Sequence, residues 1–297
     1  MSTGAHHRLL PDGRRLHLGH GPIDLIVQAD GPEASVAEAY RAALARFDGL
    51  LEELVAELPL LRQPVREAEC PLQGAIARRM WQAARQFLPV FVTPMAAVAG
   101  AVAEAVLATM RLPGINRASV NNGGDIALFL APGAEPWRLG VVVDPQNPAS
   151  PGTIRIGPRD RCRGVATSGA QGRSHSLGIA DSVTVLATDA PTADVAATLL
   201  GNAVDLPRHP AIRRAPAEML SPDSDLGARL VTVSVGALSA ADIARALDLG
   251  ENMADAMLAA GRIEGAVLVL QGQVRLVGDV PLAMNTPLIE NGKFINV

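Results

Sequence analysis

The stretch from Val90 to Met110 carries a single charge, that of Glu104, so it has to lie either in a protein core or in a membrane. Its length would span a bilayer. However, Pro94 stands near its start, and alanine, valine and glycine drive membrane insertion more weakly than leucine or phenylalanine. Larger apolar residues recur at helical spacing beside a face of small residues: Met95, Val98, Val102, Val106 and Met110, and Ala96, Ala99, Gly100 and Ala103. The pattern predicts a buried helix against which another backbone packs closely, and no membrane contact.

Charge and aromatic content exclude several classes of function. The chain of 297 residues has 26 basic and 30 acidic residues, and 48% of it is hydrophobic, which excludes a disordered chain. An isoelectric point of about 5.9 argues against a nucleic-acid binder with a broad basic field. Aromatic residues make up only 3%, too few for base-stacking platforms. Because Lys293 is the only lysine, a catalytic lysine is nearly excluded as well.

The two cysteines and the N-terminus bear on the compartment. Cys70 and Cys162 have neither the spacing of a zinc site nor that of a disulfide framework, and free thiols are the favoured interpretation. His6, His7 and Arg8 precede any long apolar run, so no signal peptide is predicted. We therefore expect a cytoplasmic protein.

The order of the predicted elements indicates an α+β fold with largely antiparallel sheets. Asn122-Gly123-Gly124 between two apolar runs is a strong hairpin signal. No linker divides the chain, so residues 1–297 are expected to form a single unit. Helices are predicted over 35–58, 72–87, 94–111, 191–201 and 239–261, and strands over 14–19, 23–28, 118–121, 125–131, 138–143, 153–156, 164–167, 182–188, 230–235, 266–271 and 274–278, with a loose tail from Pro281.

Asn121-Asn122-Gly123-Gly124-Asp125 is the first segment that could carry chemistry. It can be a two-residue turn in which asparagine tolerates a positive φ. It can also be a place where the backbone approaches a ligand that no side chain would allow. Spacing alone favours the turn.

The second segment runs from Ala166 to Ser176 and combines small residues with three hydroxyls, Arg173 and His175. Successive small residues leave backbone N–H groups available, which favours an anion-binding nest. It lacks the Gly-Lys-Ser/Thr ending of a Walker loop, and Ser168 is not in a Gly-x-Ser-x-Gly elbow. An exposed loop without ligand is the alternative.

Asp194 and Thr198 form the third candidate. They lie four residues apart on the predicted helix and so share a face. A carboxylate and a hydroxyl on one face can hold Mg²⁺, which takes oxygen ligands and often keeps waters or ligand phosphates. The ordinary alternative is an aspartate that favours the helix dipole and a threonine that bonds back to a carbonyl. His17 and His20 could bind a metal as well, but solvent-facing histidines are the favoured interpretation there.

The three segments occur in an order that resembles the ApbE superfamily of FAD:protein FMN transferases, over roughly residues 90–205. In that family a strand ending in Asn-x-Gly-Gly-Asp-Ile precedes a Thr-Ser-Gly loop, a Ser-Val-Thr-Val strand, and a helix that begins Ala-Asp with threonine four residues after the aspartate. The corresponding positions here are Asn121 to Ile126, Thr167 to Gly169, Ser182 to Val185, and Ala193-Asp194 with Thr198.

The resemblance implies two closely packed subdomains, with FAD between them and Mg²⁺ near its pyrophosphate. Asp194, Thr198 and the backbone carbonyl of Ala99 would be the metal ligands. The residues implied in binding the cofactor are Asn122, Gly123, Gly124, Asp125, Thr167, Ser168 and Gly169. His175 and Asp181 stand where the family has a histidine and an aspartate with catalytic roles.

The sequence departs from the transferases at two places, and these keep alternatives open. The stretch Ala96 to Ala101 lacks the lysine of the family's Gly-x-x-Ala-Lys-Gly motif, and no Asp-Pro-x-Thr-Gly segment follows His175. The first hypothesis is a flavin- and magnesium-binding transferase or hydrolase that acts at a nucleotide pyrophosphate. The second is a binding protein or enzyme for another heterocycle, such as a pterin or a different flavin, without FMN transfer. The third is a structural protein without ligand, with the Ala-rich helix as a homo-oligomer interface.

Overall fold

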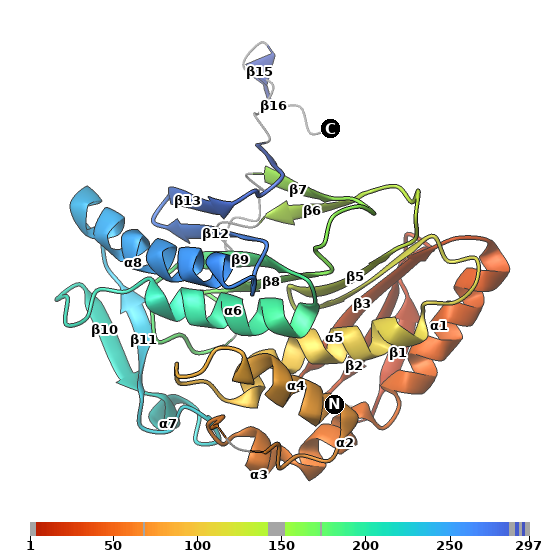
Figure 1. The fold of residues 1–297 in the computed structure, drawn as a ribbon, viewed down its shortest axis with the longest axis horizontal. Coiled ribbons are helices and arrows are strands. Elements are labelled where there is room, and N and C mark those ends of the chain that lie inside the picture. The colour runs from red at the N-terminus through yellow and green to blue at the C-terminus, as the bar shows by residue number, and fades with distance from the viewer. Residues whose placement is uncertain are drawn as a thin grey trace.

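A nine-stranded sheet runs through the computed structural model, which describes residues 4–67, 69–141, 152–172 and 174–284, together with the backbone of 289–290 and 293–294 (Figure 1). Every neighbouring pair of strands in it is antiparallel. The strands lie in the order β1 (His6–Leu9), β2 (Leu16–His20), β3 (Ile23–Asp30), β4 (Arg117–Asn122), β5 (Asp125–Leu130), β8 (Gly164–Ser168), β9 (Ser182–Ala187), β12 (Gly265–Leu270) and β13 (Gln273–Gly278). The predicted α+β fold with largely antiparallel sheets is confirmed.

The middle of the sheet is covered on both faces, which explains why β9 and β12 are buried along their whole length. Alternate residues of a strand point to opposite faces. Accordingly, Ala266 and Leu268 pack with the helices, whereas Val267 and Val269 pack in a second apolar cluster. That second cluster lies under a small antiparallel sheet made of β6 (Trp137–Val141), β7 (Gly152–Ile156) and β14 (Leu282–Met284).

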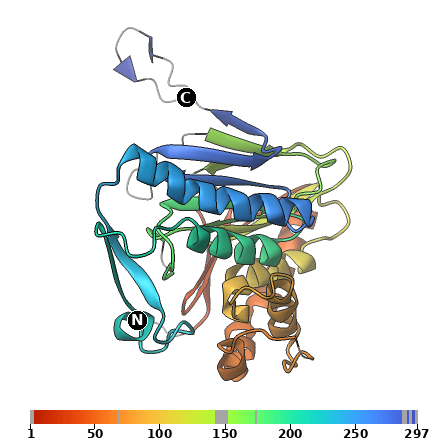
Figure 2. The same cartoon turned by 60° about the vertical axis from the view of Figure 1, so that its left-hand side comes forward.

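Three long helices cover the other face: α5 (Val98–Thr109), α6 (Ala190–Ala203) and α8 (Ala240–Ala259) (Figures 1 and 2). The predicted buried helix is α5, which a 3₁₀ turn, η1 (Pro94–Ala97), introduces. A Cβ atom on Gly100 would lie 2.4 Å from the Ala190 carbonyl oxygen at the start of α6. The small residues of α5 therefore serve a close crossing with α6, and the expected close backbone packing is confirmed. None of the described helices combines the length and hydropathy needed to cross a membrane.

The predicted helix over 35–58 is wrong, because the chain breaks it at Gly49. α1 (Glu33–Phe47) ends there, and Gly49 takes a φ of 73°, a left-handed conformation that glycine adopts without a steric penalty. Two short helices follow, α2 (Leu50–Ala56) and α3 (Leu58–Leu61), and then α4 (Ala75–Arg85).

A separate hairpin of β10 (Ile212–Pro216) and β11 (Leu230–Val235) stands apart from the large sheet and holds the short helix α7 (Ala217–Leu220) between its strands (Figure 2). The backbone N–H of Thr232 donates to the Ser176 carbonyl, which joins β11 to the loop after β8. The sequence analysis did not predict β1, β10 or β14. Near the C-terminus, β15 (Ile289–Glu290) pairs with β16 (Lys293–Phe294).

The side chains of four further residues test smaller expectations. His17 bonds to Asp24 at 2.7 Å, and His20 is buried against Phe47, so the prediction of solvent-facing histidines at these two positions is wrong. Cys70 and Cys162 are free thiols, as expected.

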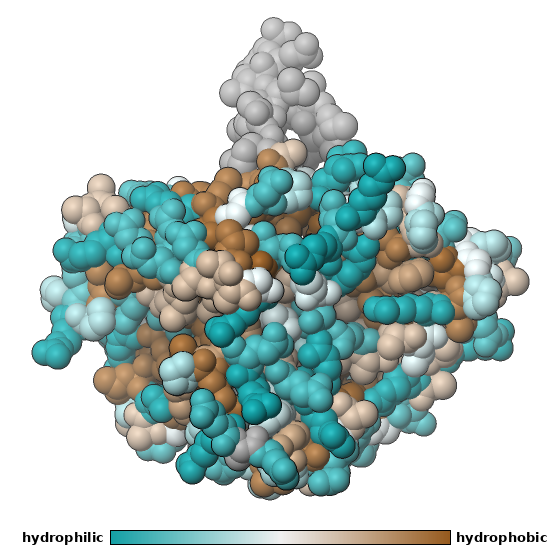
Figure 3. Space-filling view, viewed as in Figure 1, coloured by the Kyte–Doolittle hydropathy of each residue, from teal (hydrophilic) through white to brown (hydrophobic). Residues whose placement is uncertain are grey.

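Figure 3 shows hydrophilic and hydrophobic side chains interspersed over the face that carries α4, α6 and α8.

Candidate functional site

A cavity of about 370 Å³ lies where η1 and the start of α5 meet α6, the loop after β8 and the segment after α7. Six of the predicted site residues line it, although they come from four distant parts of the chain. They are Ala99, Asp125, Ser168, His175, Asp194 and Thr198. The fold therefore brings together half of the residues that the sequence analysis singled out.

Helix α6 presents one polar stripe to this cavity. Asp194, Thr198 and Asn202 line it and recur every four residues, whereas nearly all other residues of the helix are buried. Spacing of four residues places side chains on one face of a helix. The helix starts where Asp189 caps it by accepting a hydrogen bond of 2.8 Å from the Thr192 N–H. The shared face of Asp194 and Thr198 is thus confirmed, and Asn202 extends it by a turn.

The carboxylate of Asp194 meets the first turn of α5. Its Oδ2 atom accepts a hydrogen bond of 2.9 Å from the Gly100 N–H. Burial raises the pKa of Asp194 well above its usual value, and the nearby charge of Asp125 raises it further, while the backbone N–H groups of Gly100 and Ala99 act in the opposite direction. Two carboxylates close enough to oppose each other's ionisation would be stabilised by a cation between them.

The hairpin at Asn121 to Asp125 is a two-residue turn, and it also supports the cavity wall. Gly123 and Gly124 have φ angles of 66° and 117°, and the Gly124 N–H donates to Asn121 Oδ1 at 2.8 Å. Asn122 is buried and donates from Nδ2 to the Ala99 carbonyl at 3.2 Å. The two-residue turn is confirmed, but its positive φ angles fall on the two glycines and not on an asparagine. Asn122 holds the start of α5 in place.

The loop after β8 closes one side of the cavity. A Cβ atom on Gly169 would lie 2.3 Å from the Asp181 carbonyl oxygen, so the loop passes too close to the next strand for any side chain there. Asn202 Oδ1 accepts a hydrogen bond of 2.8 Å from the Leu177 N–H and so anchors the loop to α6. His175 is exposed on this anchored segment and lines the cavity.

Thr167 points away from this cavity wall and bonds to Thr184 on β9, with 2.9 Å between the two hydroxyl oxygens. Its backbone N–H donates to Asp125 Oδ1 at 3.3 Å. Thr167 therefore fixes the position of Asp125. Gly123, Gly124 and Gly169 are not among the lining residues either. They allow the backbone conformation and close packing of the two loops.

Asp181 lies elsewhere, in a second cavity of about 490 Å³ beside β11. One of its carboxylate oxygens accepts from Gln171 Nε2 at 3.0 Å, and the other accepts from the Gln271 N–H at 2.5 Å. It therefore links the loop after β8 to the turn between β12 and β13. The structure does not place Asp181 with His175.

Several lining residues were missed by the sequence analysis. Asn202 could have been found, because it continues the spacing of Asp194 and Thr198. Thr93 and Asp225 could not, since 132 positions separate them in the chain and only the fold brings Thr93 Oγ1 to 2.5 Å from Asp225 Oδ2. Ser221 and Ser224 join the wall from the same segment as Asp225.

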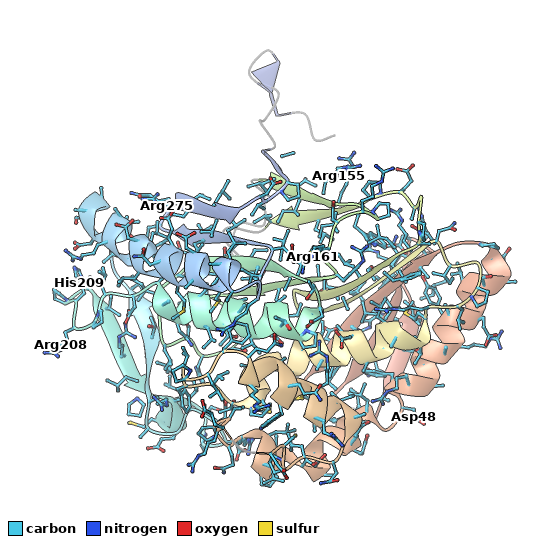
Figure 4. The ribbon with its side chains drawn as sticks, in the orientation of Figure 1. Asp48, Arg155, Arg161, Arg208, His209 and Arg275 are labelled. Carbon is cyan, nitrogen blue, oxygen red and sulfur yellow. The ribbon has the colours of Figure 1, made fainter. Side chains whose placement is uncertain are left out.

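The titratable side chains of the cavity wall are mostly acidic. Asp125, Asp194 and Asp225 line it, His175 is the one residue there that can become cationic, and no arginine or lysine is among the described lining residues. Arg155, Arg208 and Arg275 lie at the edge of the molecule in Figure 4 and contribute nothing to the lining. No group of three or more His, Cys, Asp and Glu side chains within the described ranges is arranged to hold a metal. A cation here would therefore depend on a mixed set of oxygen donors.

The sequence of the chain is similar to those of known proteins. The model of the family described as AbpE bacteria matches residues 7–276. A UPF0280 protein of Methanothrix thermoacetophila is 40% identical over 188 residues, which cover 62% of this chain and 75% of the relative. A UPF0280 protein of Methanocella arvoryzae is 37% identical over 161 residues, covering 54% of this chain and 63% of that protein.

Solved structures of low sequence identity are also similar to the chain. The apo form of the flavinyl transferase ApbE of Pseudomonas stutzeri is 14% identical, with a TM-score of 0.39 and coverage of 94% of both chains. The ApbE protein of Thermotoga maritima is 16% identical, with a TM-score of 0.38 and coverage of 83% of this chain and 74% of that protein.

Proposed function

Because the chain belongs to the AbpE bacteria family, we propose that it binds FAD together with Mg²⁺ in the cavity between α5 and α6 and acts at the pyrophosphate of the nucleotide. The observation that carries this proposal is the carboxylate of Asp194. It lines the cavity, and burial together with the nearby charge of Asp125 opposes its ionisation. A divalent cation would relieve that opposition.

The donor set fits magnesium. Asp194 and Asp125 supply carboxylate oxygens and Thr198 supplies a hydroxyl, which are the hard donors that Mg²⁺ takes. The Ala99 carbonyl accepts from Asn122 Nδ2 at 3.2 Å and, as part of helix α5, from the helical N–H four residues on, so the side-chain oxygens are the better candidate ligands. Mg²⁺ usually keeps waters and phosphate oxygens among its ligands, which agrees with the small number of protein donors here.

The cavity also fits a flat heterocycle. Its volume of about 370 Å³ lies within the range of small-molecule sites. Part of the wall is apolar, and these residues can contact the faces of a ring: Phe91, Met95, Leu177, Leu199 and Leu226. A dinucleotide would place one of its two halves here and extend toward the solvent with the other.

The absence of arginine and lysine from the described wall sets a condition on phosphate binding. A pyrophosphate group would face three aspartates, with no arginine or lysine of the described wall to balance its charge. Magnesium, when bound, would supply the Lewis acid and the positive charge for chemistry at the phosphate. Asp194 and Thr198 would hold the nucleotide through it, and His175 would accept the proton of an attacking hydroxyl at the cavity mouth.

A second candidate is a heterocycle-binding protein without transfer activity, in which a pterin or another flavin takes the place of FAD. One observation favours it. Asp181, the second residue expected in catalysis, has both carboxylate oxygens hydrogen-bonded in the other cavity. Only His175 would then remain for proton transfer.

The third hypothesis is a structural protein with a homo-oligomer interface on the Ala-rich helix. The small face of that helix packs against α6 within the chain, so that face does not support such an interface. Cytoplasmic location, two subdomains, and the absence of a nucleic-acid partner stay predictions.

Thermal unfolding with FAD tests the proposal. We expect FAD with Mg²⁺ to stabilise the wild type by about 2.7 kcal/mol at a hundred times its Kd. Asp194→Asn and Thr198→Val should reduce that stabilisation, because each removes an oxygen donor. Asp223→Asn and Thr109→Val are matched controls that lie off the cavity wall. Release of AMP on adding a protein acceptor would distinguish transfer from binding, and stabilisation that survives EDTA would favour the second candidate.

A further inference from the structure

The segment after α7 closes the cavity through two contacts with the strand-like residues before η1. Thr93, which is buried, donates from Oγ1 to Asp225 Oδ2 at 2.5 Å. The guanidinium of Arg229 lies 3.4 Å from the centroid of the Phe91 ring, a cation–π contact. These contacts hold Asp225 at a fixed place in the wall, although it comes from a loop.

Asp225 differs from the other two carboxylates of the cavity. Asp194 meets the N-terminal turn of α5 and is influenced by Asp125, so these two form one acidic pair. Asp225 belongs to another element, and the residues beside it in the lining include Phe91 and Leu226, which are apolar. Within the part of the chain that the structure describes, its Oδ1 atom accepts no hydrogen bond. A half-buried acceptor beside an apolar wall is suited to a hydrogen-bond donor on the edge of a ring.

We propose that Asp225 selects the heterocycle of the ligand by accepting a hydrogen bond from a ring N–H of the imide or lactam type. This inference rests on the proposed function and deepens it. The imide N–H of a flavin provides such a donor, and the lactam edge of a guanine or pterin provides it as well. The adenine ring has no ring N–H of this type, so the adenine half of FAD does not satisfy Asp225.

The charge of Asp225 also orients the nucleotide. A carboxylate attracts a hydrogen-bond donor and repels a phosphate, whereas the Asp194–Asp125 pair can hold a phosphate through Mg²⁺. The heterocycle therefore lies toward Asp225 and the phosphates lie toward α6. Thr93 is a positioning residue in this arrangement, because it occupies Oδ2 and leaves Oδ1 to the ligand.

Calorimetric titration of FAD and of FAD methylated at the imide nitrogen, both with Mg²⁺, tests the inference. Methylation removes the donor and leaves the phosphates unchanged. We expect the wild type to bind FAD about 10- to 100-fold more tightly than the methylated analogue, as for a hydrogen bond to a charged group. In Asp225→Ala the two ligands should bind with the same affinity, with FAD weakened to the level of the analogue.

Control variants separate this role from a change in folding. Asp223→Ala removes an aspartate two residues away whose side chain is 87% exposed, and it should keep the full discrimination. Thr93→Val should reduce the discrimination, and Thr93→Ser should restore it. Retained discrimination in Asp225→Ala would overturn the inference while FAD binding itself upheld the proposed function.

GDP and ADP provide a second pair of probes, since they differ in the ring edge. If the wild type binds GDP more tightly than ADP and does not bind FAD, and Asp225→Ala removes that difference, the role of Asp225 holds while the flavin proposal fails. If the wild type binds FAD and the methylated analogue equally, and GDP and ADP equally, the inference is wrong.

Discussion

The carboxylate of Asp194 on α6 accepts a hydrogen bond of 2.9 Å from the backbone N–H of Gly100 on α5. At this glycine the two helices lie close together, since a Cβ atom on Gly100 would lie within 2.8 Å of three backbone atoms of Ala190 and Pro191. The same crossing that buries the small face of α5 therefore determines where the acidic group of the cavity lies.

Gly100→Ala should destabilise the protein by about 1–3 kcal/mol, because the backbone of α6 has to move away from the new methyl group. Gly201→Ala is the matched control on α6. Its Cβ atom would meet only Ser168 Oγ at 3.8 Å and other ordinary contacts. Replacement of a helical glycine by alanine should stabilise there by about 0.5–1 kcal/mol. Urea unfolding of both variants checks the prediction, and equal effects of the same sign would contradict it.

Asp194→Asn should become more stable relative to the wild type as the pH rises. The folded state keeps the proton of Asp194 to a higher pH than the unfolded state, because burial and Asp125 raise the pKa above 3.8. The wild type therefore gains this stability in full below the pKa that Asp194 has in the unfolded state. It loses the gain as the pH rises through the pKa that Asp194 has in the folded state. The asparagine of the variant does not titrate, so it adds no such pH dependence to the stability. Denaturant unfolding in metal-free buffer across this range measures the difference, and a difference independent of pH would contradict the account.

Asp181→Asn should cost about 1–3 kcal/mol of stability and leave the affinity for FAD and Mg²⁺ unchanged. Its two carboxylate oxygens accept from Gln171 and from the backbone of Gln271, outside the first cavity. Gln171→Ala removes only the first of these bonds and should cost less. Unfolding and calorimetry on the same preparations separate the two effects. A large loss of affinity with little loss of stability would instead support a role for Asp181 in catalysis.

Only one of the two thiols should react quickly in the folded protein. Burial raises the pKa of Cys162 to about 12, so that almost none of this thiol is ionised at pH 8. Cys70 is half-buried and remains accessible to reagents. A chromogenic disulfide reagent should therefore titrate a single fast thiol, and Cys70→Ser should abolish that phase. A fast phase that persists in Cys70→Ser would show that Cys162 is exposed by local opening.

Local patterns made much of the fold predictable. The hairpin at Gly123-Gly124, the buried helix and the shared face of Asp194 and Thr198 all depend on spacing within a few residues. The break at Gly49 was not visible, because the apolar spacing continues across it and the left-handed φ of Gly49 is a property of the folded backbone.

The candidate site was predictable in part for the same reason. Motifs indicated the residues on α6 and on the two loops, but the wall formed by Thr93 and Asp225 depends on long-range contact between a segment before η1 and the hairpin β10–β11. Asp181 illustrates the opposite case. It follows the same loop as His175 in sequence, yet the fold directs its carboxylate to the turn between β12 and β13.

The most direct test of the central claim is the Kd of FAD measured against the concentration of Mg²⁺. The described cavity wall has three aspartates and no arginine or lysine, so these residues would hold a pyrophosphate together with a cation. We predict that the affinity rises with Mg²⁺ to a plateau and falls by about 100-fold or more in EDTA, which corresponds to about 2.7 kcal/mol. The same affinity in EDTA as in saturating Mg²⁺ would contradict the account.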